Sequence, residues 1–195
     1  MCGIIGYIGK NRAVSVLIDG LEKMEYRGYD SSGVCLCNED KINIIKSVGK
    51  INNLKERIDY NKIFSYTRGI AHTRWATHGG VTLENAHPHR QGKVVIVHNG
   101  IIENAKELKE NLQLEGYKFE SDTDTEVIAA LLDYYLEDDF LKTIEKAMKK
   151  LIGSYALGIV VEGKEDAIYV VKKDSPLIIG VGNGENFFAS DIVAI

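Results

Sequence analysis

The sequence predicts an α+β fold in which antiparallel sheets pack against helices. Strand-like and helix-like segments come in blocks, strands first, then helices, then strands again, whereas a regular alternation would indicate parallel βαβ units. The composition is that of an ordinary globular domain, with 45% hydrophobic and 27% charged residues. The chain has 195 residues, two prolines and no internal repeat or linker, so we interpret residues 1–195 as one domain.

The first block contains a buried strand over residues 3–8 and then a helix whose apolar residues have helical spacing. Those apolar residues are Val14, Leu17, Ile18, Leu21 and Met24. The turn-rich segment YRGYDSSG separates this helix from two strands, residues 33–37 and 41–49, which a polar turn over residues 38–40 connects. A weaker pattern indicates a short helix near residues 54–58.

The second block begins with a strand over residues 68–76, a long loop over residues 77–92 and a clear strand over residues 93–100. Amphipathic spacing then predicts three helices, over residues 104–116, 124–137 and 140–151. The last part of the chain is rich in strands, which we expect over residues 154–161, 166–173, 176–182 and 186–190.

Charge and hydropathy exclude several classes of partner. The net charge is −4, which disfavours a nucleic-acid partner. No apolar run reaches the roughly 18 residues that a membrane-spanning helix needs. The first residues lack the basic and apolar regions of a secretory signal, so we expect a cytoplasmic protein with reduced thiols.

The three cysteines have two different settings in the sequence. Cys35 and Cys37 lie two apart on a predicted strand, so they share one face, and burial is favoured over metal binding. Cys2 directly follows the initiator methionine and has two interpretations. It is a small buried hydrophobe, or, once Met1 is removed, it offers a thiol nucleophile and an α-amine base on one residue.

All five histidines lie between positions 72 and 98. They are His72, His78, His87, His89 and His98. Their irregular spacing and the absence of an HExxH motif disfavour a metal site. The alternative is that the segment from His87 to His89 stiffens a loop and that the others form hydrogen bonds at the edge of a site. The glycine spacings match neither a dinucleotide site nor a P-loop, so we expect no metal and no cofactor.

The long loop has the length of an active-site lid. Trp75 stands at its start between polar neighbours, which favours a ligand-facing position over a core position. The planar guanidinium of Arg74 suits a carboxylate, although an ordinary surface arginine explains the local sequence equally well.

Asn99 and Gly100 end the strand over residues 93–100, and this dipeptide is typical of a hairpin turn. From spacing alone the turn is the favoured interpretation. The alternative is functional, because an amide donor beside an exposed backbone N–H makes a workable oxyanion hole.

The segment SDTDTEV predicts the start of a helix. Thr123 and Glu126 fit a capping box, with Asp124 in the first turn near the positive end of the helix dipole. This structural role is sufficient by itself. The carboxylate of Asp124 can also face a cleft and bind a substrate cation.

Six segments together resemble the class II glutamine amidotransferase family of N-terminal nucleophile hydrolases, as found in the glutaminase domain of glucosamine-6-phosphate synthase. The resemblance runs from Cys2 to about Asp191. The segments are MCGIIGYIG, LEKMEYRGYDSSG, GIAHTRWATHGGVTLENAHPH, VVIVHNGIIEN, SDTDTEVIAALL and GENFFASD.

The resemblance implies a four-layer αββα sandwich, two antiparallel sheets face to face with helices outside. It also implies roles for single residues. Cys2 would be the nucleophile after removal of Met1, with Asn99 and the Gly100 N–H as the oxyanion hole. Arg74, with Thr77 and His78, would bind the substrate carboxylate, and Asp124 would bind its amino group. Trp75 would lie on the lid, and Arg27 would support the N-terminal region.

The implied activity is hydrolysis of the side-chain amide of L-glutamine through a Cys2 thioester, without a cofactor. In the family the ammonia then reaches fructose 6-phosphate in a sugar-phosphate isomerase region, which has no counterpart here. We therefore expect the chain to be part of a longer protein, with a possible homodimer through the missing region. The alternatives are an amidotransferase with another acceptor, such as phosphoribosyl pyrophosphate, and a glutamine-binding or metal-sensing module without turnover.

Overall fold

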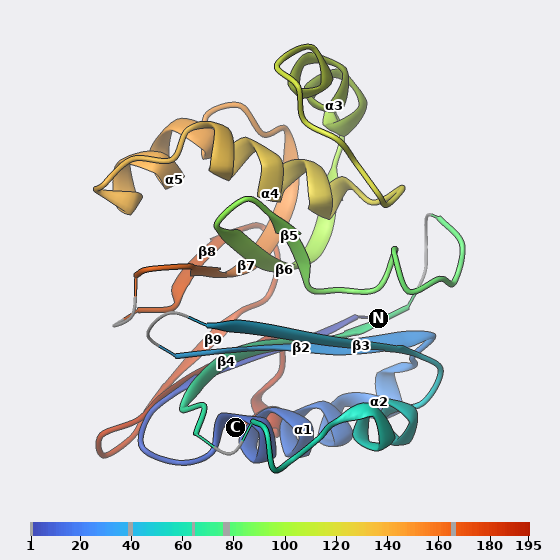
Figure 1. Ribbon diagram of the computed structural model, residues 1–195, viewed down its shortest axis with the longest axis vertical. Coiled ribbons are helices and arrows are strands. Elements are labelled where there is room, and N and C mark those ends of the chain that lie inside the picture. The colour runs from blue at the N-terminus through green and yellow to red at the C-terminus, as the bar shows by residue number, and fades with distance from the viewer. Residues whose placement is uncertain (1, 39–40, 64, 76–78, 165–166) are drawn as a thin grey trace.

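The elements follow the predicted block order and stack in four layers. The computed structural model describes residues 2–38, 41–63, 65–75, 79–164 and 167–195. Figure 1 shows helices α1 and α2 in one outer layer, helices α3 to α5 in the other, and two sheets between them. The predicted αββα sandwich is therefore confirmed.

The first sheet is antiparallel and has the strand order β3-β2-β4-β1-β10-β9. Its strands are β1 (Gly3–Ile8), β2 (Ser31–Cys37), β3 (Ile42–Val48), β4 (Arg68–Arg74), β9 (Ile178–Val181) and β10 (Asn186–Ala189). Ile5 of the interior strand β1 pairs with Ala71 on β4 and with Ala189 on β10. The N-terminal segment is therefore fixed between two neighbours rather than left as a free chain end.

The second sheet has the order β5-β6-β7-β8. Its strands are β5 (His89–Gln91), β6 (Val94–Ile102), β7 (Gly153–Val161) and β8 (Tyr169–Lys173). The hairpin interpretation of Asn99 and Gly100 is wrong, because β6 continues through both residues and pairs with β7 as far as Ile102. Gly100 permits this with a φ of 138°, and a Cβ there would lie 2.0 Å from the Ser154 carbonyl oxygen.

Helices cover the outer face of each sheet. The first sheet carries α1 (Ala13–Met24) and α2 (Ile51–Arg57), the latter starting before the predicted residues 54–58. The short 3₁₀ turns η1 (Glu25–Arg27) and η2 (Ile192–Ala194) accompany them. The second sheet carries α3 (Ala105–Leu114), α4 (Asp124–Tyr134) and α5 (Phe140–Met148). Among the described residues, no helix has the length and apolarity that crossing a bilayer requires.

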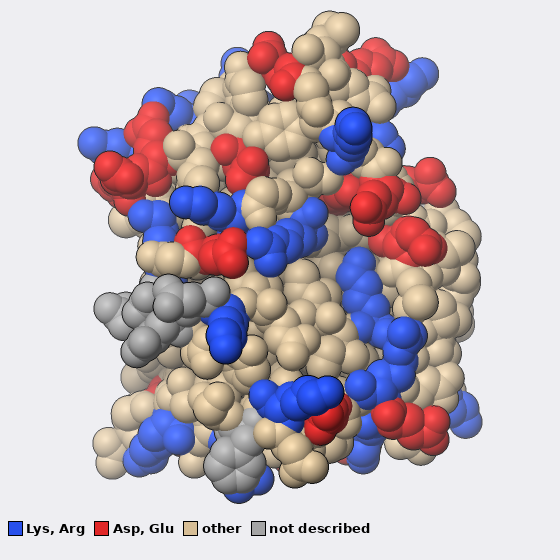
Figure 2. All heavy atoms as spheres, viewed as in Figure 1, with Lys and Arg blue, Asp and Glu red and all other residues tan. Residues whose placement is uncertain are grey.

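An apolar layer holds the two sheets together. Strands from both sheets contribute side chains to it, and the predicted burial of Cys35 and Cys37 is confirmed. Its buried members are Ile4, Cys35, Cys37, Ile70, Val95, Val97, Ala156, Val160 and Phe188. On the face seen in Figure 2, basic and acidic side chains are interspersed, so the net charge of −4 is not gathered there into one patch.

Candidate active site

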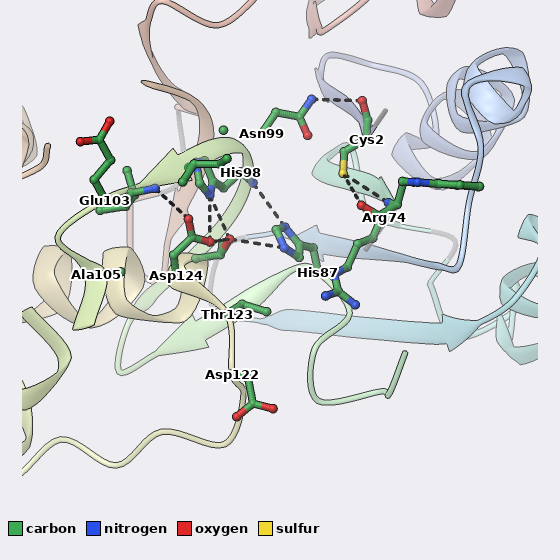
Figure 3. A pocket seen from close by; sticks show the side chains of 15 residues that line it. Cys2, Arg74, His87, His98, Asn99, Glu103, Ala105, Asp122, Thr123 and Asp124 are labelled. Atoms are coloured by element: carbon green, nitrogen blue, oxygen red, sulfur yellow. Dashed lines mark hydrogen bonds and ion pairs between the residues drawn. The ribbon is translucent and has the colours of Figure 1, made fainter. Parts of the chain in front are cut away.

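A cavity of about 360 Å³ opens at one end of the layer between the sheets. Its walls come from the start of the chain, the end of β4, the end of β6 and the first turn of α4 (Figure 3). The lining residues are Cys2, Arg74, Trp75, His87, Ala105 and residues 98–103 and 122–125. Segments that are distant in the sequence therefore meet around one small space.

The thiol of Cys2 lies beside the backbone of Trp75. The Trp75 N–H donates a hydrogen bond to Sγ at 3.3 Å, and the Trp75 carbonyl oxygen lies 3.6 Å from the same sulfur. Burial raises the pKa of the Cys2 thiol, and the Trp75 N–H opposes this by stabilising the thiolate. Because the pKa remains raised overall, a nucleophilic Cys2 needs a base to remove its proton.

Asn99 points at the same end of the cavity. Its Nδ2 donates a hydrogen bond to the Cys2 carbonyl oxygen at 3.3 Å, and its Oδ1 lies 3.1 Å from Nε2 of His72. An amide donor is therefore next to the residue that carries the thiol, as Figure 3 shows.

The edge of β6 presents backbone N–H groups to the cavity. The N–H of His98 donates to Nδ1 of His87 at 3.4 Å, and the N–H of Ile102 donates to Asp124 Oδ2 at 2.9 Å. Alternation along a strand puts the N–H of Gly100 on this same edge, between the other two. Gly100 also lines the cavity, so its N–H and the Asn99 amide can act together on one ligand.

Asp124 lies at the other end of the cavity, in the first turn of α4. Its carboxylate accepts from Ile102, and Oδ1 lies 3.7 Å from Nδ1 of His98. Thr123 caps the helix, because its Oγ1 accepts from the Glu126 N–H at 3.3 Å, as predicted. A capping box also has a hydrogen bond from the backbone N–H of the capping residue to the Glu side chain. Here Glu126 Oε2 accepts instead from the Ser121 N–H at 2.7 Å.

Arg74 lines the cavity but is buried and already engaged. Its guanidinium donates to the Gly80 carbonyl oxygen at 3.1 Å and lies 3.7 Å from the Asp30 carboxylate. A guanidinium has five N–H donors in a planar fork, a geometry that suits a carboxylate. Thr77 and His78, which the sequence also suggested, lie outside the described residues.

The Trp75 side chain is 51% exposed at the mouth of the cavity and lies against Gly28. A Cβ at Gly28 would approach the indole to 2.3 Å, and the φ of 94° there also favours glycine. The neighbouring Arg27 forms an ion pair with Asp191 at 3.2 Å, directly after β10. Sequence reasoning missed Gly28, although its place in the turn-rich YRGYD segment was a signal.

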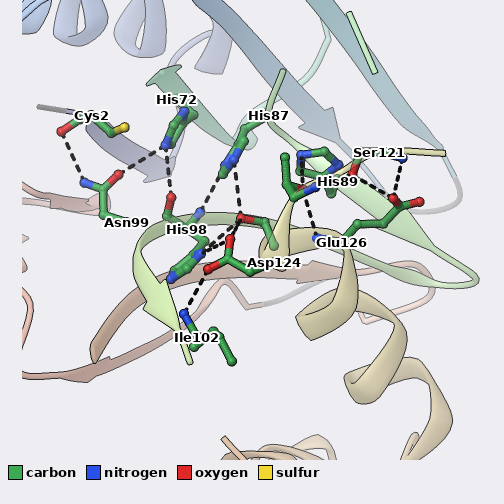
Figure 4. A network of polar contacts seen from close by, with 12 residues as sticks. Cys2, His72, His87, His89, His98, Asn99, Ile102, Ser121, Asp124 and Glu126 are labelled. Atoms are coloured by element: carbon green, nitrogen blue, oxygen red, sulfur yellow. Dashed lines mark hydrogen bonds and ion pairs between the residues drawn. The ribbon is translucent and has the colours of Figure 1, made fainter. Parts of the chain in front are cut away.

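The described histidines form a buried network under the cavity (Figure 4). The rings of His72 and His87 stack at 4.0 Å, and His89 meets His87 edge-on at 4.8 Å. Burial lowers the pKa of His72 to about 3 and also lowers the pKa values of His87, His89 and His98. These four rings are therefore neutral at pH 7.

Hydrogen bonds to neighbouring groups account for the presence of these histidines in the interior. Thr125 Oγ1 lies 3.0 Å from Nδ1 of His98 and 3.3 Å from Nε2 of His87. In the part of the chain that the structure describes, no group of three or more His, Cys, Asp or Glu side chains could hold a metal ion. The structure places His98 in the cavity wall and His72 against Asn99, which also lines the cavity. Sequence reasoning did not connect His72 with Asn99, and the clustering of histidines was the available signal.

Two stacked antiparallel sheets with outer helices, and Cys2 facing the end of the layer between them, define the fold of the N-terminal nucleophile hydrolases. The solved structures agree. A glutamine phosphoribosylpyrophosphate amidotransferase from B. subtilis aligns with a TM-score of 0.83 and 27% identity, over 99% of this chain and 42% of that one.

The chain belongs to the glutamine amidotransferase domain family, whose sequence profile matches residues 78–195. Curated relatives named glutamine--fructose-6-phosphate aminotransferase [isomerizing] are similar along the whole chain. The protein from Clostridium acetobutylicum is 51% identical and that from Thermococcus kodakarensis 50% identical, each over 100% of this chain. The chain spans about a third of the length of these relatives, 32% and 33% respectively.

Proposed function

We propose that this chain hydrolyses the side-chain amide of L-glutamine to glutamate and ammonia, with Cys2 as the nucleophile. One observation carries the proposal. Cys2 and Asn99 lie at one end of a cavity of about 360 Å³, where Asn99 Nδ2 donates to the Cys2 carbonyl oxygen, and the carboxylate of Asp124 lies at the other end. Such a space suits a small ligand with a reactive group at one end and a charged group at the other. Membership of the amidotransferase family supports the same reaction.

The first step activates the thiol. Removal of Met1 frees the α-amine of Cys2, whose reference pKa of about 7.7–8.0 is close to the thiol value of about 8.5. From these reference values proton transfer from thiol to amine is nearly balanced in energy. Burial of Cys2 raises its pKa and shifts the balance against the thiolate, and the Trp75 N–H at 3.3 Å offsets part of that shift. No histidine is needed as the base, which fits the lowered pKa values of the described histidines, because a group with a low pKa is a weak proton acceptor.

The next steps exchange the amide for a thioester. The thiolate attacks the side-chain carbonyl carbon of glutamine, and the electron pair of the C=O bond moves to the oxygen. Asn99 Nδ2 and the Gly100 N–H donate to this oxyanion. As the C–N bond breaks, the α-ammonium of Cys2 gives its proton to the leaving nitrogen, and ammonia departs. The restored amine then takes a proton from water, and the hydroxide attacks the carbonyl carbon of the γ-glutamyl thioester. The C–S bond breaks, glutamate is released, and the Cys2 thiolate leaves beside the protonated amine.

The remaining residues would hold the amino-acid end of the substrate. Asp124 accepts the α-ammonium group, and Arg74 binds the α-carboxylate, with Thr77 and His78 as further ligands. Trp75 covers the cavity mouth as a lid. Arg27 supports the N-terminal strand, because its partner Asp191 follows β10, which pairs with β1.

We extend the proposal to the longer protein. The relatives' name suggests that the ammonia goes to fructose 6-phosphate in a sugar-phosphate isomerase region, with glucosamine 6-phosphate as product. Identities near 50% along the whole chain favour this acceptor over phosphoribosyl pyrophosphate, for which the solved neighbour has 27% identity. A homodimer through that region and a cytoplasmic location remain predictions.

The test combines an intact mass with a turnover assay. We expect a protein that lacks Met1 to release glutamate and ammonia from glutamine in amounts far above one equivalent. Binding of glutamine without turnover by the processed protein would instead indicate a binding module. Supplying fructose 6-phosphate or phosphoribosyl pyrophosphate to the full-length protein then identifies the acceptor.

A further inference from the structure

We propose that His72 is a positioning residue that holds the side-chain amide of Asn99 in the orientation that turns Nδ2 toward Cys2. The inference rests on the proposed function, because it assigns a reason for the oxyanion-hole geometry. It concerns a residue that does not itself line the cavity but contacts Asn99, which does.

An asparagine side-chain amide can adopt two orientations that differ by a rotation of about 180° about its terminal torsion. Its two ends have nearly the same shape but opposite hydrogen-bonding character, and its terminal torsion is broad and roughly two-fold. With Nδ2 toward Cys2, Asn99 donates to a developing oxyanion. With Oδ1 there, the same residue would present a second oxygen and oppose that charge. The site therefore needs something that distinguishes the two ends.

Nε2 of His72 makes this distinction. It lies 3.1 Å from the backbone carbonyl oxygen of His98 and 3.1 Å from Oδ1 of Asn99. A backbone carbonyl oxygen only accepts, so Nε2 must carry a hydrogen. Since Nε2 carries a hydrogen, the atom of Asn99 that faces it must be an acceptor. The acceptor of an asparagine amide is Oδ1. The carbonyl of His98 thus acts through the ring of His72 on the Oδ1 end of Asn99, and the Cys2 carbonyl, which accepts from Nδ2, favours the same orientation.

The ring that carries this N–H is held firmly. His72 is 0% exposed and stacks on His87 at 4.0 Å. His87 is fixed in turn, because its Nδ1 accepts from the His98 N–H at 3.4 Å and its Nε2 donates to Thr125 Oγ1 at 3.3 Å. Among the described residues, Nδ1 of His72 has no hydrogen-bond partner, which suits an unprotonated nitrogen. The pKa of about 3 agrees with a neutral ring, and the two contacts of Nε2 select the tautomer.

The experiment compares glutamine hydrolysis by His72→Leu and His72→Gln in the protein without Met1. Leucine removes the donor, so Asn99 is free to turn and kcat should fall about 10-fold to 100-fold, with KM for glutamine within about 2-fold. Glutamine can place its amide N–H near the position of Nε2, so His72→Gln should recover most of the lost kcat. In an Asn99→Ala background, His72→Leu should change kcat by less than about 2-fold, because the orienting partner is already absent.

Ile70→Ala is the matched control. Ile70 lies two residues before His72 on β4, is buried on the same face, and contacts the apolar layer. The Ile70→Ala substitution should lower the melting temperature and leave kcat per folded molecule unchanged. Equal kcat for His72→Leu and the parent would overturn the inference. So would equal losses in His72→Leu and Ile70→Ala, or full additivity with Asn99→Ala.

A second measurement separates this inference from the proposed function. If the parent protein shows no glutamine turnover, the proposed function fails, and NMR of labelled protein still decides the role of His72. We expect the Nε2–H tautomer at pH 7 and nuclear Overhauser contacts from the Asn99 amide protons to Cys2. An Nδ1–H tautomer, or amide protons in contact with the His72 ring, would refute the inference.

Discussion

The two ends of the layer between the sheets are built from the same strands and have opposite character. At one end Ile4, Ile70 and Val97 pack in an apolar cluster. Two residues away along each chain segment, on the same face, stand Cys2, His72 and Asn99, which are joined by hydrogen bonds. One step of the strand period therefore separates the apolar core from the candidate active site.

This difference shows how the protein combines stability with chemistry. The apolar end contributes burial, at roughly 25 cal/mol per Å² of apolar surface. The polar end consists of neutral rings and an amide that form hydrogen bonds inside the fold. Substitutions at the apolar end should thus lower stability and spare turnover. Substitutions at the polar end should lower turnover and change stability less.

The largest effect is expected at Cys2. Cys2→Ala should abolish glutamine hydrolysis, and so should any retained residue before Cys2, because the α-amine that accepts the thiol proton would be an amide. A glutamine-like electrophile should label Cys2 and spare the buried Cys35 and Cys37. Mass spectrometry with the turnover assay checks both. Full activity in a protein whose mass includes Met1 would contradict the mechanism.

Substitutions at Asn99 and Val97 test most directly whether the two ends of the layer differ in function. Asn99→Ala should lower kcat by roughly 10²–10³-fold with little change in KM, as for a lost oxyanion donor. Val97→Ala, two residues earlier on the same face of β6, should cost ~2 kcal/mol of unfolding free energy and keep kcat. The opposite pattern, with stability lost at Asn99 and turnover per folded molecule preserved, would assign Asn99 a structural role only.

The residues that we propose to anchor the substrate should act mainly on KM. Asp124→Ala and Arg74→Ala each remove a charged contact far from the reacting carbon, at a cost on the order of 2–4 kcal/mol in kcat/KM. Asp124→Asn is a matched control, because it retains an acceptor for the Ile102 N–H and lacks the charge. Near-normal kcat/KM in the alanine variants would remove both residues from the binding site.

The smallest effect concerns stability against pH. Burial lowers the folded-state pKa values of the four described histidines, to about 3 for His72. The unfolded chain, with pKa near 6.5, then binds more protons, so their contribution is full above about pH 6.5 and is lost as the pH falls toward 3. Each histidine adds up to about 1.4 kcal/mol per pH unit to this slope.

Urea unfolding between pH 7.5 and pH 5 measures that slope. His89→Gln should reduce it by up to about 1.4 kcal/mol per pH unit, because a residue that takes up a proton on unfolding has been removed. Val97→Ala should lower stability equally at every pH. An unchanged slope in His89→Gln would show that His89 does not remain neutral in the folded protein.

Most of the secondary structure could be predicted because it depends on local periodicity. The apolar spacing from Val14 to Met24 matches one buried face of α1, and the hairpin of β2 and β3 follows from two strands and a polar turn. The prediction was wrong at Asn99 and Gly100, where a local turn signal competed with nine residues of pairing between β6 and β7. Tertiary pairing prevailed, because a strand with a long partner gains more than a turn at its middle would provide.

The sequence by itself determined which chemical groups are present, namely a cysteine at position two, an amide before a glycine, and an aspartate in the first turn of a capped helix. Only the tertiary structure decided how those groups face one another. The hydrogen bond from Asn99 to Cys2 joins residues 97 positions apart, and the one from His72 to the His98 carbonyl joins residues 26 apart. No local pattern encodes a tautomer or an amide orientation, because each is set by an acceptor that another strand supplies.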